Sequence, residues 1–227
     1  PMDFPRPVMQ DHKGHTVEFS IPQQETLRLK EIATSENVTL YILLLSLFNM
    51  FLYHLSGMED IIVGTPVACR RHPGVTKMLG MFVNTLALRN YPAGEKTFKT
   101  FLQEVKTRTL QDFEHQEYRY EDIVSKVAVN RDTSRNPLFD VMFLMKNLDY
   151  AKVELPNLTM QPLDYEKKTS MFDMTLSVFE SGDTLLCGLE CAASLFRKST
   201  IQRFSGYFKQ IIRSVTEPGS LESSLAS

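Results

Sequence analysis

A run of sixteen residues from Leu40 to Leu55 (LYILLLSLFNMFLYHL) constrains the fold of this chain more than any other segment. Three polar residues interrupt the run, and it is shorter than the roughly 20 apolar residues that a membrane-spanning helix needs. We therefore expect a central helix that is buried on most of its sides. Thr39 is placed to cap the start of this helix, and Gly57 is placed to end it.

The rest of the sequence predicts further strands and helices. Alternating or β-branched apolar runs predict six strands, at residues 17–21, 61–68, 82–88, 138–145, 174–180 and 185–191. Apolar residues at three- and four-residue spacing predict four helices besides the central one. One begins after Pro22, and the other three span residues 98–113, 123–127 and 201–215.

Three features refine this pattern. Ser181-Gly182-Asp183 is typical of a hairpin turn, and Pro66 indicates a sheet edge, a bulge or the end of a strand. The charged segment from Asn147 to Lys168 contains two prolines, and we expect a loop with one short strand. Six strands and five helices in this order predict a two-layer α/β sandwich, in which helices pack on one mixed β-sheet.

Composition narrows the functional classes. Lys and Arg number 25 against 27 Asp and Glu, and the net charge of −2 offers no general attraction to nucleic acid or to anionic lipid. Three cysteines cannot all pair within one chain, which favours a reduced, cytoplasmic setting. The start at Pro1 has neither an initiator Met nor a signal-peptide pattern, so we expect a fragment of a longer chain that lies neither in nor on a membrane.

Familiar catalytic and metal-binding patterns are missing from the sequence. Cys187 and Cys191 share one face of a predicted strand, but about 13 Å would separate them, too far for one metal ion to bridge. No glycine-rich phosphate loop and no Gly-x-Ser-x-Gly motif is present. His54 lies in the central helix, where we interpret it as a core histidine rather than a base.

Three stretches are nevertheless unusually specific: LGMFVNTLALR (79–89), HQEYRYE (115–121) and RDTSRNPL (131–138). In the first, Asn84 would place an amide on an otherwise apolar strand face, where a buried amide needs hydrogen-bond partners. In the third, polar side chains can lock a loop through bonds to its backbone. On physical grounds alone, a structural role is the simpler interpretation of each stretch.

Together and in this order, these stretches resemble the later motifs of condensation domains of non-ribosomal peptide synthetases. The resemblance begins at Arg6-Pro7 and includes Gly64-Thr65-Pro66-Val67. Its third long match extends to RDTSRNPLFDVMF (131–143), and it continues, less distinctively, to the last helix. It implies a lobe like chloramphenicol acetyltransferase, one of two lobes that enclose a tunnel. It also implies that carrier proteins bring thioester-linked substrates on phosphopantetheine arms, so that no cofactor binds the lobe directly.

The catalytic motif of that family, His-His-x-x-x-Asp-Gly, belongs to the first lobe, and this sequence contains no adjacent pair of histidines. We therefore expect the C-terminal lobe alone, with the N-terminal lobe and carrier proteins as partners and no activity in isolation. The resemblance divides the chain into a linker (1–16), the lobe (17–217) and a tail or linker (218–227). It also places a segment that crosses to the first lobe near residues 147–171.

The resemblance assigns few individual residues. Arg70 follows the Pro-Val strand and is implied to pair with the Asp of the missing motif, although a solvated loop arginine is the alternative. Cys69 stands where the family usually has glycine. Asn84 and Thr85 are implied to lie near the acceptor side of the tunnel, with a role in the fold as the alternative. The remaining motif residues are expected to be structural: His115, Arg131, Asp132, Arg135 and Asn136.

Other functions stay open at this point. The lobe could serve as a non-catalytic module that docks a carrier protein, or it could come from an epimerisation or heterocyclisation domain. A free-standing acetyltransferase fits less well, because no histidine-containing catalytic motif is present. The sequence does not specify the amino acids joined or their stereochemistry.

Overall fold

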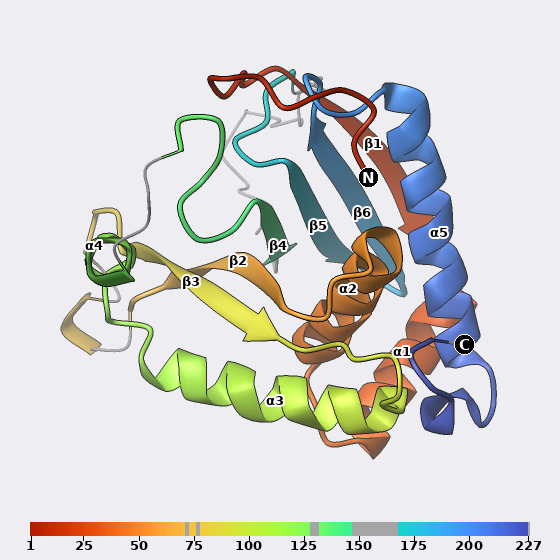
Figure 1. Ribbon diagram of the computed structural model, residues 1–227. Coiled ribbons are helices and arrows are strands. Elements are labelled where there is room, and N and C mark those ends of the chain that lie inside the picture. The colour runs from red at the N-terminus through yellow and green to blue at the C-terminus, as the bar shows by residue number, and fades with distance from the viewer. Residues whose placement is uncertain (71–72, 76–77, 128–131, 147–167, 227) are drawn as a thin grey trace, which may run out of the picture.

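A computed structural model describes residues 1–226 except 71–72, 76–77, 128–131 and 147–167 (Figure 1). The described residues form one six-stranded sheet whose strand order is β1-β6-β5-β4-β2-β3. Its strands are β1 (Gly14–Ile21), β2 (Ile61–Ala68), β3 (Val83–Asn90), β4 (Val141–Lys146), β5 (Met174–Ser181) and β6 (Thr184–Ala192). The sheet is mixed, because β4 runs parallel to β2 and β5 while the other neighbouring pairs are antiparallel.

The α-helices are α1 (Gln23–Ser35), α2 (Leu40–Ser56), α3 (Phe98–Glu114), α4 (Tyr120–Val127) and α5 (Lys198–Thr216). Four of the described α-helices, α1, α2, α3 and α5, pack on one face of this sheet. Two short 3₁₀ helices, η1 (Pro73–Val75) and η2 (Ser220–Glu222), complete the described elements. The core combines inward residues of α1, α2, α3 and α5 with alternate residues of the strands. These elements confirm the two-layer sandwich.

The central helix α2 forms the middle of the core. Every residue from Ile42 to Leu52 is buried, as the apolar run predicts. The Thr39 side chain accepts a hydrogen bond from the backbone N–H of Ile42 at 3.2 Å, and Gly57 ends the helix at φ 68°. Among the described residues no single helix is long and apolar enough to cross a membrane; α1 and α2 pass that test only as a pair, bent by 108°.

The prediction for His54 is wrong. This histidine is exposed in the last turn of α2, where the helix leaves the core, and its ring lies 5.4 Å from the ring of Tyr53. The apolar run continues to Leu55, but the part of α2 that other elements bury ends at Leu52. Composition therefore predicts the helix but not the depth of its last turn.

Most other local predictions are confirmed. A two-residue turn with Gly182 at φ 59° joins β5 to β6, as the turn signal indicates. Pro66 lies in the part of β2 beyond its two residue pairs with β4, so on that side it is at a sheet edge within the part of the chain that the structure describes. β1 begins three residues earlier than predicted, β3 begins at Val83 rather than Phe82, and β4 begins at Val141 rather than Leu138. Residues 147–167, which make up most of the predicted loop (147–168) and of the predicted crossing element (147–171), lie outside the described residues.

Candidate functional site

The Asn84 side chain joins two of the three specific stretches. From β3, its amide nitrogen donates to the carbonyl oxygens of Gln116 (2.8 Å) and Tyr118 (2.7 Å). Its amide oxygen accepts from the backbone N–H of Tyr120 at 3.3 Å. The prediction that this amide needs partners is confirmed, and the partners are backbone groups of the segment between α3 and α4. Asn84 therefore fixes that segment against the sheet.

Substitution of Asn84 provides a first testable prediction. Asn84→Ala should lower the free energy of unfolding by about 2 kcal/mol, because three backbone groups lose their partner in a partly buried site. Asn84→Asp should cost at least as much, since a carboxylate cannot donate to two carbonyl oxygens. Urea unfolding measures the loss, and hydrogen exchange should accelerate at residues 116–120.

Thr85→Ala is the matched control. Thr85 is the next residue of β3 and is paired with Pro66 of β2, but its side chain points to the other face of the sheet. We expect a change below about 1 kcal/mol for this variant. Equal losses for the two substitutions would show that the Asn84 bonds do not hold the segment.

Arg70 organises the loop that follows β2. Its Nη1 atom donates to the carbonyl oxygens of Val75 (2.7 Å) and Met78 (3.0 Å), and its Nη2 atom donates to that of Gly80 (3.1 Å). Its guanidinium carbon also lies 4.4 Å from the centre of the Phe82 ring. In this lobe, therefore, Arg70 is a structural centre of its loop, and its pairing with another lobe stays a prediction.

Gly64 and Phe139 join the remaining motifs on the sheet face away from the helices. The Phe139 ring lies directly over Gly64, so that a Cβ atom built at Gly64 would come within 2.5 Å of Cζ of that ring. The ring also lies 5.6 Å from Tyr120 and 5.6 Å from Phe172, centre to centre. Three aromatic side chains thus lie together, and a glycine in β2 leaves room for the central one.

The loop before β4 is locked by its own polar residues, as predicted. Asp132 accepts hydrogen bonds from the backbone N–H (2.9 Å) and hydroxyl (2.6 Å) of Ser134, which hold the pKa of Asp132 below its ordinary value. Arg135 pairs with Asp140 through two hydrogen bonds. The amide of Asn136 donates to the carbonyl oxygen of Met171 at 3.2 Å.

The other two motif residues are His115 and Arg131. His115 is the C-cap of α3, and its carbonyl oxygen accepts the N–H of Tyr118 at 3.0 Å. This bond helps to turn the segment that Asn84 holds. Arg131 lies outside the described residues.

Arg6 ties the start of the chain to this loop and to the sheet. Its Nη1 atom donates to the Ser134 carbonyl oxygen (3.1 Å) and to Oδ1 of Asp173 (3.0 Å), and its Nη2 atom pairs with Oδ2 of Asp173. Only 19% of the Arg6 side chain and 15% of the Asp173 side chain are exposed. Burial raises the pKa of Asp173, and the positive charge of Arg6 opposes that rise.

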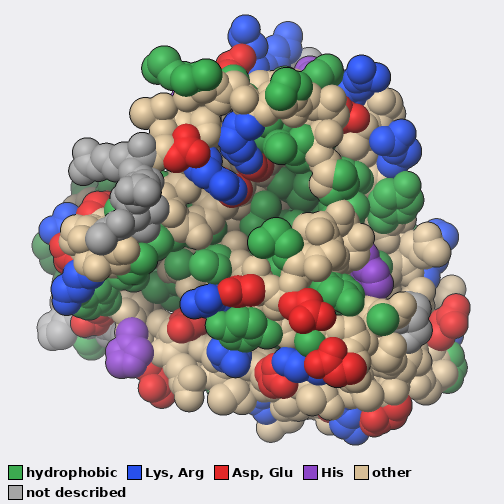
Figure 2. Space-filling view, in the orientation of Figure 1, with side chains coloured by type: hydrophobic (Ala, Val, Ile, Leu, Met, Phe, Trp, Pro, Cys, Tyr) green, Lys and Arg blue, Asp and Glu red, His purple; other side chains and the backbone are tan. Residues whose placement is uncertain are grey.

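A cavity of about 370 Å³ lies beside these ion pairs. Its lining is mostly apolar, and it also includes Arg135, Asp140 and Asp173. Figure 2 shows this face of the molecule, with hydrophobic side chains in a central hollow and charged side chains at its upper edge. The carboxylates of Asp140 and Asp173 are already paired with arginines, so they stabilise the wall of the cavity.

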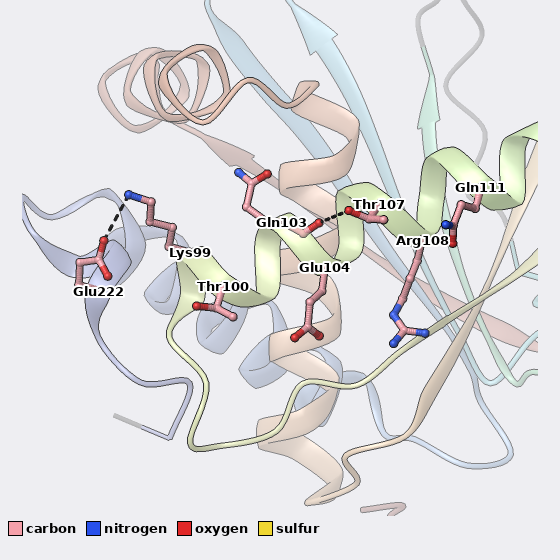
Figure 3. A pocket seen from close by; sticks show the side chains of 8 residues that line it. All are labelled: Lys99, Thr100, Gln103, Glu104, Thr107, Arg108, Gln111 and Glu222. Atoms are coloured by element: carbon pink, nitrogen blue, oxygen red, sulfur yellow. Dashed lines mark hydrogen bonds and ion pairs between the residues drawn. The ribbon is translucent and has the colours of Figure 1, made fainter.

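A larger, shallower groove of about 830 Å³ follows the outer side of α3 (Figure 3). Its side chains have partners in α3 and beyond it: Thr107 donates to the Gln103 carbonyl at 2.9 Å, Gln103 donates to the Glu36 carbonyl at 3.0 Å, and Lys99 pairs with Glu222 at 3.3 Å. None of the specific motif residues lines this groove. The motifs instead gather around β2, β3 and the start of β4.

The cysteines do not form a reactive cluster. Cys187 and Cys191 are buried on β6, and burial raises the pKa of the Cys187 thiol to about 12. The thiol of Cys69 donates to the Gln116 carbonyl oxygen at 3.4 Å, which adds a further contact to the segment that Asn84 holds. Within the described ranges, no group of three His, Cys, Asp or Glu side chains is placed to bind a metal ion.

Sequence reasoning missed two of the central residues. The role of Asp173 was not predicted, because its partner Arg6 lies 167 positions away in the chain. Phe139 belongs to a predicted apolar strand and to the motif at 131–143, but neither pattern predicts its contact with Gly64. A signal for its contact did exist, since Gly64 interrupts a β-branched strand, and glycine in a strand often marks a close approach.

Comparison with known proteins agrees with this grouping of motifs. The family model described as the condensation domain matches residues 1–225. Bacitracin synthase 3 of Bacillus licheniformis is 40% identical over 217 residues, and tyrocidine synthase 3 of Brevibacillus parabrevis is 43% identical over 217 residues. Each match covers 96% of this chain but only 3% of the relative, so the chain corresponds to a small part of either protein.

Solved structures give the same fold. A four-domain nonribosomal peptide synthetase in its holo form, bound to AMP and glycine, matches all of this chain with a TM-score of 0.92 and 25% identity, over 18% of its own length. The first condensation domain of the calcium-dependent antibiotic synthetase matches 98% of this chain with a TM-score of 0.76 and 13% identity. The matched part is 50% of that domain's chain.

Proposed function

This chain belongs to the condensation-domain family of non-ribosomal peptide synthetases, and we propose that it forms the second lobe of a domain that makes peptide bonds. One observation carries the proposal: the match covers 50% of the chain of a solved condensation domain. The sequence also contains no His-His-x-x-x-Asp-Gly motif. We infer that the other half supplies it.

In the parent reaction, the amine of an acceptor substrate attacks the carbonyl carbon of a donor thioester. A C–N bond forms and the C–S bond breaks. The amine loses one proton, and the leaving sulfur takes up one proton to depart as a thiol. The phosphopantetheine arms of carrier proteins hold both substrates. This lobe then contributes shape rather than proton transfer, with Asn84 and Thr85 near the acceptor side of the tunnel.

The architecture supports a shaping role. Asn84 holds backbone groups of residues 116–120, and the ring of Tyr120 lies 5.6 Å from that of Phe139, which packs on Gly64, so β2, β3 and the stretch at 115–121 are connected. Positioning reacting groups can supply a large share of a rate enhancement, and a rigid wall is what positioning needs.

A reconstitution assay tests the proposal. The 227-residue chain and the longer parent chain are each mixed with a donor and an acceptor carrier that bear aminoacyl thioesters. We expect dipeptide product from the parent and none above background from the 227-residue chain, as judged by mass spectrometry of released products. Dipeptide formation by the 227-residue chain alone would overturn the proposal that the missing motif is essential.

The same materials separate catalysis from docking alone. If a parent chain with an intact His-His motif binds both carriers but forms no dipeptide, the lobe belongs to a docking module. If it epimerises or cyclises the donor instead, it belongs to a sister domain.

A further inference from the structure

The first residues of the chain, which the sequence predicts to be part of a linker, are bonded to three distant parts of the lobe. We call residues 3–10 the strap. In Figure 1 this red segment crosses the upper end of the sheet before the chain enters β1. Its partners are the start of α5, the loop before β4 and the residues before β5, all of which lie far away in the sequence.

Asp3 joins the start of the strap to α5. Its backbone N–H donates to the carbonyl oxygen of Leu195 at 2.9 Å. Its carboxylate accepts hydrogen bonds from the backbone N–H of Arg197 (2.8 Å) and from the hydroxyl of Thr200 (3.0 Å). The guanidinium carbon of Arg197 also lies 5.2 Å from the centre of the Phe4 ring. The start of the strap is therefore held through its backbone and through its side chains.

The Asp3 carboxylate supplies what the start of α5 lacks locally. Arg197 is the N-cap residue of this helix, its side chain makes no capping hydrogen bond, and the first turn contains no acidic residue. A carboxylate placed here binds an N–H group at the positive end of the helix dipole. The hydrogen bond from the N–H of Arg197 accordingly lowers the pKa of Asp3. A residue 194 positions earlier thus completes the start of α5.

Beyond Asp3, the strap is held along its length. Arg6 binds Asp173 and the loop before β4. The hydroxyl of Thr133 donates to the Val8 carbonyl oxygen at 3.0 Å, and the backbone N–H of Gln10 donates to the Thr133 carbonyl oxygen at 3.0 Å. The strap therefore has partners at both of its ends and in its middle.

The strap also has a stiff backbone. Pro5 and Pro7 flank Arg6, and each proline fixes its own φ at about −65° and restricts the residue before it to extended conformations. A backbone with few alternative conformations loses less entropy when it becomes ordered. The sequence of the strap therefore favours a segment that stays bound to the lobe.

We propose that the strap is a fixed part of this lobe, anchored by Asp3 on α5, and that the joint between the two lobes of the parent domain lies before Asp3. This inference rests on the proposed function, in which the other lobe precedes this chain. A joint needs residues whose backbone is free to turn, whereas the strap is engaged from Asp3 to Gln10. Any pull that the other lobe exerts on the connection would then act on the start of α5.

Insertion of a Gly-Ser pair at two places tests the position of the joint. In the longer parent chain, the pair is inserted either immediately before Pro1 or between Phe4 and Pro5, inside the strap. The inner insertion moves Asp3 out of register with Arg6, so it should lower the melting temperature of the domain by about 2–4 °C. The outer insertion should change it by less than about 1 °C. The inner insertion should have the same effect in the 227-residue chain.

Asp3→Ala tests the anchor itself, and Asp11→Ala is the matched control, because Asp11 accepts a local bond from the N–H of Lys13. Without the Asp3 carboxylate, amides of residues 197–200 should exchange at least fivefold faster, while those in the last turn of α5 should not change. This contrast separates local opening from a general loss of stability. Asp3→Asn should retain part of the protection, since asparagine also caps helices. Asp11→Ala should leave exchange in α5 unchanged.

The other outcomes overturn the inference. An outer insertion that destabilises the parent as much as the inner one would mean that no joint lies before Asp3. Unchanged melting after the inner insertion, or unchanged exchange at the start of α5 after Asp3→Ala, would show that the strap is not anchored there. Dipeptide formation by the unsubstituted parent is measured in parallel. If the parent forms dipeptide while the two insertions behave alike, the proposed function stands and this inference fails.

Discussion

Gly64→Ala should lower the free energy of unfolding by about 3 kcal/mol, which corresponds to a melting temperature lower by roughly 6–12 °C for a chain of this size. The added Cβ atom would lie 2.5 Å from Cζ and 2.6 Å from Cδ2 of Phe139. The strand cannot retreat, because β2 is bonded to β3 along its whole length. The ring would have to move, together with the aromatic contacts that it makes to Tyr120 and Phe172.

Two comparisons make this prediction specific. Gly206→Ala in α5 introduces the same methyl group where nothing lies within 4 Å, and it should stabilise the chain by about 0.5–1 kcal/mol. Gly64→Ala should cost much less in a Phe139→Leu background, in which the obstructing ring is absent. Urea denaturation measures all four variants. A penalty for Gly64→Ala that persists without the ring would assign it to the strand backbone instead.

Arg6→Met should lower the free energy of unfolding by about 3 kcal/mol at neutral pH, because it leaves the buried carboxylate of Asp173 without its cation. The effect should depend on pH. Burial raises the pKa of Asp173 above its value in the unfolded chain, so the folded chain holds that proton more tightly. Stability then falls as the pH rises through the folded pKa. Without Arg6 this pKa rises further, so the penalty should shrink as the pH is lowered.

The double variant Arg6→Met/Asp173→Asn is the decisive control, since neither buried charge remains. We expect it to recover about 1 kcal/mol or more relative to Arg6→Met alone. Arg89→Met breaks an exposed pair with Asp60 and should have only a small effect. If the double variant loses as much unfolding free energy as Arg6→Met and Asp173→Asn lose together, the ion pair between Arg6 and Asp173 is not the source of the stability.

Local features of the fold are predictable from the sequence because neighbouring residues determine them. The apolar run, the Thr39 cap and the Gly57 terminus define α2, and Gly182 defines the turn between β5 and β6. The strand order is not predictable in this way. Pairs such as β1 with β6 depend on contacts between distant parts of the chain, which no local pattern encodes.

The candidate site shows the same division. The sequence predicts that Asn84 needs partners, since an amide on an apolar strand face is costly alone. It does not predict that the partners are backbone atoms at residues 116–120, because backbone groups have no residue-specific signature. The resemblance implies that Arg70 pairs with an Asp of the other lobe, and the structure adds a role within its own loop that only three-dimensional placement reveals.

The pairing of β1 with β6 also affects how this lobe is made on the ribosome. Among the strands that the structure describes, Gly14–Ile21 pairs with Leu185–Ala192, more than 160 positions later in the chain. At about 5–20 residues per second, the first strand waits roughly 10–35 s for its partner to be synthesised. During that interval its hydrogen-bonding edge is open to other chains. We therefore expect newly made chains to depend on chaperones until the last strand emerges, and slower translation to increase aggregation.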